Sequence, residues 1–458
     1  MSFTTDESRW SDVWLAAAAR GTTICGDFLA ATALALALQG AGAGGLAVSG
    51  LLLAATLPLV VLAPLAGRLA DRTDSRTLLV TVGFGQAAIC ALLAVVEQPV
   101  LVIGLVTLLA CGLAVTQPCL AALLPKMVRP ADLPRASAIS QTAVSLGALG
   151  GPVLAGLLVG QFGTRVPLLL DAATYLALVV AGLLLRTRRG GRRPAASQAA
   201  ASQAPAASSP AVSGGVPTPG GTEIGWRLRR DPLMLVMVVS TAVVIAAIGG
   251  INVIEVFFIR ETLGGSATTY GLVSAAWMAG MLPGTWLAVR LARRLDDDGA
   301  LVRGVLATLA VCSLMVLLAA TVPAAGVLVP LWLVGGAANG GENVFANLLT
   351  ARRVPEAMRA RAYASYGAAV QGGSMAGFLI GGALLAVVPP RPLIAGAGVV
   401  GLLVVLVFVP VVTRAVRLSS HAGLATPGRP AESEPSAGDT VGPWLSASHA
   451  RGSGTSSS

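Results

Sequence analysis

Residues 46–66, LAVSGLLLAATLPLVVLAPLA, form an uncharged and largely apolar run that ends in the charged stretch 67–76, GRLADRTDSR. A helix of about 20 apolar residues is long enough to cross the ~30 Å hydrocarbon core of a bilayer. Charged side chains are costly inside that core. The two stretches together predict a membrane-spanning helix followed by a turn at the membrane surface.

The same pattern recurs along the whole chain. Hydrophobic residues make up 55% of the sequence and charged residues 11%, and the mean hydropathy of +0.79 lies far above that of soluble proteins. We therefore predict an all-α membrane protein with about twelve transmembrane helices in two sets of six. The first set is expected at 13–39, 46–66, 77–97, 100–124, 137–160 and 165–186, and the second at 233–259, 268–290, 300–321, 325–348, 363–388 and 391–414.

Composition also predicts the boundaries between parts of the chain. Residues 187–231 are rich in Ala, Ser, Pro and Gly, which cannot form a hydrophobic core, so we expect a cytoplasmic linker. Residues 223–231 at its end are expected to form a short amphipathic helix on the membrane surface. The other predicted parts are a cytoplasmic N-terminus at 1–12, six-helix bundles at 13–186 and 232–414, and a disordered cytoplasmic tail at 415–458.

The distribution of Lys and Arg predicts the orientation. Only Arg165, Arg260 and Arg391 fall on one side of the predicted helices, and the remaining loop Lys and Arg residues fall on the other side. Cytoplasmic loops carry the excess of positive charge. Both termini are therefore expected in the cytoplasm.

Several function classes are disfavoured by the sequence. The formal net charge is +10, but the basic residues are scattered between apolar runs, so we expect no nucleic-acid partner. The five cysteines show no C-x-x-C spacing, and His421 and His449 lie in the predicted tail, so we expect neither a metal site nor a cofactor. No Ser-His or Cys-His arrangement lies within the predicted helices, which argues against an enzyme.

An internal repeat supports two related halves. Residues 123–140, LLPKMVRPADLPRASAIS, resemble residues 348–365, LLTARRVPEAMRARAYAS. Each segment leaves one predicted helix and enters the next. Repeated halves of this kind predict two bundles related by an axis along the membrane normal.

The turn at 67–76 resembles the G-x-L-a-D-r-x-g-r-r signature of the major facilitator superfamily. The matching positions are Gly67, Asp71, Arg72 and Arg76. The resemblance implies the fold of that superfamily, with two pseudo-symmetric six-helix bundles that alternate in access to the two sides of the membrane. It also implies that this turn gates the transport cycle, with Asp71 capping a helix.

The fifth predicted helix carries Gly147, Gly151, Pro152 and Gly156, which resemble the exporter-associated motif of the superfamily. Ala138 stands where that motif begins with Gly. Tight helix packing alone is an alternative explanation for the glycines. Further similarity to drug and siderophore exporters lies at Trp14-Leu15, Gly26-Asp27, Asp171-Ala172-Ala173 and Tyr270-Gly271, whereas the arginine that many proton-coupled drug antiporters carry in helix four is missing.

Polar residues within the predicted helices are the candidates for a substrate or proton pathway, because they are costly in lipid. Asn339, Glu342, Asn343 and Asn347 form one stripe at helical spacing, and Glu342 is the leading candidate to carry a proton.

Two further groups complete these candidates. Arg20 and Asp27 share a face of the first helix, either facing the pathway or forming a structural ion pair. The resemblance adds Gln117, Asn252 and Glu255 on cavity-lining helices, although Glu255 could instead pair with Arg260 near the outer boundary.

Taken together, these features predict a monomeric, bilayer-embedded secondary transporter in a bacterial cytoplasmic membrane. We expect it to export an amphipathic small molecule, such as a drug or secondary metabolite, and to be driven by protons. Import of a small metabolite by the same fold is one alternative, and a non-transporting sensor or scaffold is another.

Overall fold

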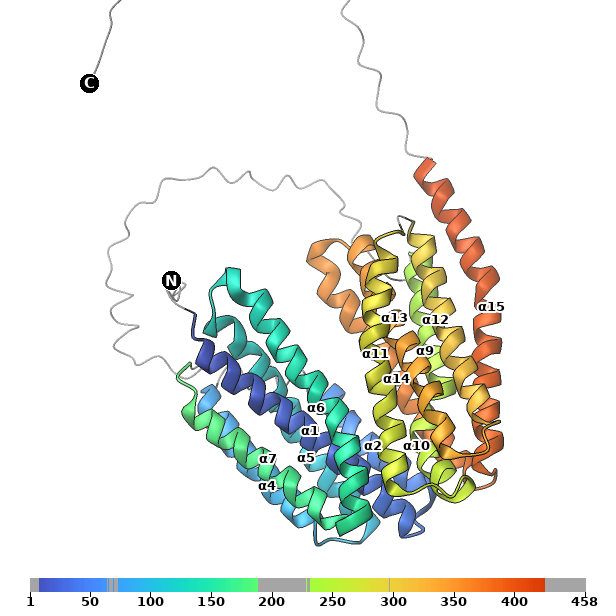
Figure 1. The fold of residues 1–458 in the computed structure, drawn as a ribbon. Helices are drawn as coiled ribbons and strands as arrows, with labels where there is room; N and C mark the ends of the chain where they lie inside the picture. Colours follow the sequence, from blue (N-terminus) through green and yellow to red (C-terminus); the bar gives the residue numbers. More distant parts are fainter. Residues whose placement is uncertain are drawn as a thin grey trace, which may run out of the picture.

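The computed structural model describes residues 8–63, 65, 69, 73–187, 228, 231–295 and 297–424. Figure 1 shows the described chain as two helical bundles side by side, the first coloured blue to green and the second yellow-green to red. The first bundle contains α1 (Trp10–Gly40), α2 (Gly44–Val61), α4 (Ser75–Leu93), α5 (Pro99–Met127), α6 (Leu133–Phe162) and α7 (Arg165–Leu184), with a 3-10 turn at Pro130–Asp132.

The second bundle begins with α9 (Pro232–Gly249) and α10 (Ile251–Phe257), which leads into a π-helical turn at Phe258–Thr262. The remaining helices are α11 (Ala267–Ala292), α12 (Asp298–Ala319), α13 (Leu328–Arg353), α14 (Glu356–Leu384) and α15 (Pro390–Leu424), with a 3-10 turn at Ala325–Val327.

Ten of the helical segments in the described chain are long and apolar enough to cross a membrane, α9 to Thr262 counting as one. Helices α13 and α14 add two more segments of 26 and 29 residues. At about 1.5 Å per residue, both exceed the ~30 Å hydrocarbon core. Their hydropathy is lower because α13 carries the polar stripe and α14 contains many Gly residues and begins with Glu356, Arg359 and Arg361. The predicted all-α fold with two sets of six helices is confirmed.

The predicted helix at 233–259 is interrupted at Gly249–Gly250, where α9 ends and α10 begins. A methyl group on Gly250 would lie 3.1 Å from the Cα atom of Gly381 in α14. Two adjacent glycines weaken a helix while permitting this close approach. The Asn252 amide stabilises the interruption by donating a hydrogen bond of 3.0 Å to the Gly249 carbonyl oxygen.

Other predicted boundaries shift or are not described. Helix α15 continues to Leu424, so the predicted boundary at 414 between bundle and tail falls inside a helix. Of the predicted linker, only Thr187, Leu228 and Asp231 are described, so most of the amphipathic helix expected at 223–231 lies outside the described residues.

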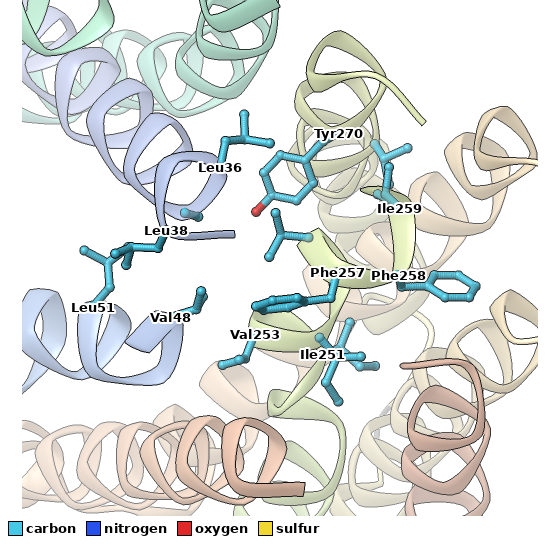
Figure 2. Packing of buried hydrophobic residues seen from close by; sticks show 14 of the residues in the cluster. Leu36, Leu38, Val48, Leu51, Ile251, Val253, Phe257, Phe258, Ile259 and Tyr270 are labelled. Atoms are coloured by element: carbon cyan, nitrogen blue, oxygen red, sulfur yellow. The ribbon is translucent and has the colours of Figure 1, made fainter. Parts of the chain in front are cut away.

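The largest hydrophobic core lies where the two bundles meet. Figure 2 shows Leu36 and Val48 of the first bundle beside Val253, Phe257 and Tyr270 of the second. In Figure 1 the bundles converge at the end that carries the α1–α2 turn and diverge at the opposite end, where α14 begins. The described structure is therefore closed at the end with the α1–α2 turn.

Two helix pairs, α6 with α11 and α2 with α14, make most of the contact between bundles. The Ser49 hydroxyl in α2 donates a hydrogen bond of 2.6 Å to the Phe378 carbonyl oxygen in α14. Nearer the closed end, the Gln39 amide donates one of 3.1 Å to the Glu261 carboxylate.

An arginine holds three helix ends together in the second bundle. Arg353, at the end of α13, forms ion pairs of 2.9 Å with Asp231 and 3.1 Å with Asp298. Asp231 directly precedes α9, and Asp298 is the first residue of α12.

We expect Arg353→Ala to lower the melting temperature of the detergent-purified protein by a few degrees, because two partly buried carboxylates lose their partner. Thermal unfolding followed by circular dichroism would test this, and Arg294→Ala, at an exposed position, provides a matched control. Equal melting temperatures for Arg353→Ala and wild type would contradict a structural role.

Candidate functional site

A cavity of about 470 Å³ lies between the two bundles. This volume falls in the range of about 300–1,000 Å³ that is usual for sites binding drug-sized molecules. Its walls come from α1, α2 and α6 of the first bundle and from α9 to α14 of the second. The residues that line it are Phe28, Ala31, Thr32, Ala35, Leu52, Pro152, Ile245, Ile248, Gly249, Ile251, Asn252, Glu255, Tyr270, Ser274, Trp277, Met278, Val316, Trp332, Asn339, Glu342, Asn343, Tyr366, Val370 and Ser374.

Five of the residues predicted for the substrate or proton pathway line this one cavity. Asn252 and Glu255 come from α10, and Asn339, Glu342 and Asn343 come from α13. Asn347, the last residue of the predicted stripe, is exposed and does not line the cavity. Its backbone carbonyl accepts a hydrogen bond of 3.1 Å from the Tyr363 hydroxyl. The polar stripe therefore enters the cavity with its first three members only.

The Glu342 carboxyl group is buried, with 2% of the residue exposed. The Tyr366 hydroxyl in α14 donates a hydrogen bond to its Oε1 atom. The Thr241 hydroxyl in α9 lies 3.5 Å from the same oxygen and is fully buried. Glu342 thus connects three helices through hydroxyl donors, and no ion pair involves it among the described residues.

The second carboxyl group of the cavity, Glu255, is also buried, with 8% of the residue exposed. Its Oε1 atom has no hydrogen-bond partner among the described residues. Ser274 and Trp332 lie beside the carboxyl group on the cavity wall. Glu255 is therefore held in the cavity with one oxygen unsatisfied.

The alternative that Glu255 pairs with Arg260 is wrong. Arg260 is exposed, and its Nη1 atom donates a hydrogen bond of 2.9 Å to the Gly265 carbonyl oxygen. Arg260 lies in the π-helical turn at Phe258–Thr262 and is not among the residues that line the cavity.

Aromatic side chains form much of the rest of the wall. The rings of Trp277 in α11 and Trp332 in α13 meet edge to face, with centroids 6.2 Å apart and an interplanar angle of 75°. Tyr270 and Tyr366 line the cavity as well. Sequence reasoning selected none of these four residues for the site, although Tyr270 was noted for its similarity to exporters, since an aromatic residue in a membrane helix can equally face lipid. No local sequence feature of Trp277 or Trp332 would have distinguished a cavity-facing position from a lipid-facing one.

Three other predicted residues, Arg20, Asp27 and Gln117, do not line the cavity. The Arg20 Nη1 atom donates a hydrogen bond of 3.3 Å to the Ser140 hydroxyl in α6. Asp27 accepts one of 2.5 Å from the Tyr175 hydroxyl in α7. In the described chain no ion pair joins Arg20 to Asp27, so the alternative of a structural pair is wrong. Gln117 is half-buried in α5.

Near Asp27 the first bundle buries a second carboxyl group that the sequence candidates did not include. Asp171 is fully buried and accepts hydrogen bonds of 3.1 Å from both the Cys90 thiol and the Thr174 hydroxyl. A methyl group on Gly26 would overlap the Asp171 carboxylate. The exporter-like Gly26-Asp27 and Asp171 positions are thus neighbours inside the first bundle.

Most of the predicted gating turn lies outside the described residues, namely Gly67, Asp71 and Arg72. Arg76 is half-buried in the first turn of α4. Asp74 caps that helix, since its carboxylate accepts a hydrogen bond of 3.4 Å from the Thr77 backbone amide.

The glycines of the fifth predicted helix divide between two contacts. A methyl group on Gly147 would lie 3.0 Å from the Cys25 backbone nitrogen in α1. One on Gly151 would lie 2.7 Å from the Cys25 carbonyl oxygen. One on Gly156 would lie 2.7 Å from the Ala267 carbonyl oxygen in α11, across the interface between bundles. Pro152 lines the cavity. The three glycines therefore have a packing explanation, and the contact made by Gly156 lies between the bundles.

Comparison with known proteins supplies the family. The sequence model described as "Transmembrane secretion effector" matches residues 7–424. The chain belongs to this family of major facilitator superfamily transporters. No curated protein matches its sequence.

Solved structures of other superfamily transporters share the fold. A point mutant of the nucleoside transporter NupG is 14% identical with a TM-score of 0.67, covering 87% of this chain and 98% of NupG. A bacterial homologue of the human lysosomal transporter Spinster, inward-facing and unoccupied, is 14% identical with a TM-score of 0.63, covering 92% and 99%. An inward-facing bacterial homologue of the iron transporter ferroportin is 17% identical with a TM-score of 0.61, covering 90% and 100%.

The family and the fold together establish the class of the protein. It is a multi-pass membrane transporter of the major facilitator superfamily and not an enzyme. Among the described residues, no group of three or more His, Cys, Asp or Glu side chains is arranged to hold a metal ion.

Proposed function

We propose that this transporter exports an amphipathic small molecule, driven by the proton gradient. The observation that carries the proposal is the cavity between the bundles, where a largely apolar wall surrounds two buried carboxyl groups, Glu255 and Glu342. An apolar cavity with few polar groups suits an amphipathic molecule better than a phosphate-rich one. A binding site between two bundles suits alternating access, in which each side of the membrane reaches the site in turn.

Glu342 is the residue proposed to carry the proton. Ionising a carboxyl group in a membrane interior is costly unless a cation or water approaches it. Binding or release of a proton at Glu342 therefore changes the energy of the conformer that buries it. Tyr366 and Thr241 connect the carboxyl group to α14 and α9, so this change reaches helices on either side of α13. The nearby Cys312 thiol donates its hydrogen bond to the Gly335 carbonyl oxygen and not to Glu342.

The arrangement of the bundles supports a place in the transport cycle. If the predicted orientation holds, the closed end with the α1–α2 turn faces outward and the diverging end faces the cytoplasm. The Spinster and ferroportin homologues with the same fold are inward-facing. We accordingly assign an inward-facing state to this structure and retain the turn at 67–76 as the gate that closes this side.

Export is favoured over import by two features. The family description refers to secretion, and the glycines of α6 match the exporter-associated motif at Gly147, Gly151, Pro152 and Gly156. Import by the same fold remains the competing function, since NupG is a nucleoside transporter. We further propose a monomer that belongs to the drug and siderophore exporters and resides in a bacterial cytoplasmic membrane.

Growth and vesicle assays test this function together. Strains that lack or overproduce the protein are compared across a panel of toxic amphipathic compounds, and overproduction is expected to raise resistance to some of them. Inverted membrane vesicles, which expose the cytoplasmic face, should then accumulate those compounds when respiration acidifies the vesicle interior. Accumulation in right-side-out vesicles instead would establish import and reject the proposed direction.

The proposed orientation predicts that both reporters of a topology experiment read cytoplasmic. Alkaline phosphatase, active only outside, is fused near Ser208 in the predicted linker or near Ser436 in the predicted tail, and both fusions are expected to be inactive. Green fluorescent protein fusions at the same positions provide the positive control. Active phosphatase at either position would overturn the orientation and the even helix number.

A further inference from the structure

Glu255 lines the cavity and contains one buried carboxyl oxygen without a partner in the described chain. Its Oε1 atom has no hydrogen-bond partner among the described residues, although only 8% of the residue is exposed. A buried carboxylate oxygen without a donor is costly to maintain and is usually paired or solvated. A cation that enters the cavity beside this carboxyl group would offset the charge that the protein leaves unpaired.

The charges of the wall restrict what that partner can be. Of the described residues that line the cavity, Glu255 and Glu342 carry carboxyl groups, and none is Lys or Arg. Glu342 accepts a hydrogen bond from Tyr366 at Oε1, whereas the buried Oε1 atom of Glu255 has no partner among the described residues. An anionic ligand would meet only repulsion at these two carboxyl groups. A ligand with one positive group satisfies Glu255 and leaves Glu342 free to exchange a proton.

Aromatic rings stand beside this acceptor. Trp332 lies next to the Glu255 carboxyl group, and Trp277 meets it edge to face with ring centroids 6.2 Å apart. Tyr270 comes from the same helix as Trp277 and also lines the cavity. The faces of such rings attract cations, with the largest effect where water is excluded. A carboxylate next to aromatic rings is the chemistry that recognises an organic cation.

From these observations we infer that the cavity binds a lipophilic organic monocation, with its positive group beside Glu255 and its apolar body against the first bundle. The first bundle contributes Phe28, Ala35, Leu52 and Pro152 to the opposite wall, which suits an apolar body. The substrate class is thus a protonated amine or a delocalised cation carrying hydrocarbon or aromatic groups. The inference rests on the proposed function only in taking this cavity as the transport site.

Equilibrium binding to the full-length, detergent-purified protein tests the inference. The probes are tetraphenylphosphonium, a cation, and tetraphenylborate, an anion of the same shape, followed by quenching of tryptophan fluorescence. Saturable binding is expected for tetraphenylphosphonium, and none is expected for tetraphenylborate. Glu255→Gln should weaken cation binding by about tenfold or more, and Trp277→Leu should weaken it by a smaller factor. Glu356→Gln, at an exposed position beyond the cavity, is the matched control for loss of one carboxyl group.

Several results would overturn the inference. These are equal binding of the cation and the anion, wild-type affinity in Glu255→Gln, or absence of saturable cation binding in a protein that elutes as a single species. A larger loss in Glu342→Gln than in Glu255→Gln would also reject the assignment of the cation to Glu255. The assay needs neither a gradient nor transport. Cation binding without gradient-driven transport would therefore reject the proposed function alone, and transport without cation binding would reject the inference alone.

Discussion

Glu342→Gln is expected to abolish substrate efflux driven by a pH gradient in proteoliposomes, to the level of protein-free vesicles. The amide preserves the shape of the side chain and its hydrogen bond with Tyr366, but it cannot bind and release a proton. If Glu342 carries the transported proton, the gradient then has no means of acting on the conformational equilibrium. The measurement is the initial rate of efflux of a compound identified by the resistance screen, with and without an imposed gradient.

Controls separate coupling from folding in this experiment. Glu356→Gln should transport at the wild-type rate, because the residue is exposed at the start of α14. Movement of substrate down its own gradient should persist in Glu342→Gln if only the coupling is lost. Full gradient-driven efflux in Glu342→Gln would mean that the proton is carried elsewhere, and the carboxyl groups of Asp27, Asp171 and Glu255 would then be tested in the same way.

Gly271→Ala is expected to reduce transport by about tenfold or more through the contact between bundles. The added methyl group would overlap the Pro152 carbonyl oxygen and lie 3.0 Å from the Gly156 Cα atom, so α11 and α6 could not remain at their present separation. The conformer with this close contact loses stability relative to one in which the helices are farther apart. A shift of this kind traps the transporter on one side of its cycle.

Transport rate and hydrogen exchange together test the Gly271 prediction. In Gly271→Ala, the backbone amides of α6 near Gly156 and of α11 near Gly271 should exchange faster than in the wild type. The control is Gly396→Ala in α15, where an added methyl group would meet no atom within 4 Å. Wild-type transport together with wild-type exchange in Gly271→Ala would show that the α6–α11 contact does not limit the cycle.

The sequence predicted the number and order of the helices because span length and charge are local properties. An apolar run such as 46–66 needs no knowledge of its neighbours to be recognised. The interruption at Gly249–Gly250 is different, since two glycines and Asn252 do not by themselves end a membrane helix and no charge or proline marks the position. It results from close packing against Gly381 of α14, a residue far away in the sequence.

The part of the candidate site that could be predicted from the sequence is the set of residues that share one face of a single helix. The spacing of Asn339, Glu342 and Asn343 places them on one face, and the structure places that face at the cavity. Arg20 and Asp27 also share a face, yet Arg20 meets α6 and Asp27 meets α7. Spacing along one helix gives the face but not the neighbour, which depends on how the bundle packs.

The two bundles contribute unequal chemistry to the cavity that they share. The first bundle supplies apolar side chains and the hydroxyl of Thr32, whereas the second supplies both carboxyl groups, Glu255 and Glu342. We therefore expect the two halves, although their backbones repeat, to control different properties of the molecule that is accepted. Substitutions in α1 should alter the size of molecule that is accepted, while those in α10 and α13 should alter the charge. The charge preference of such a protein could then change during evolution within one half, without redesign of the other.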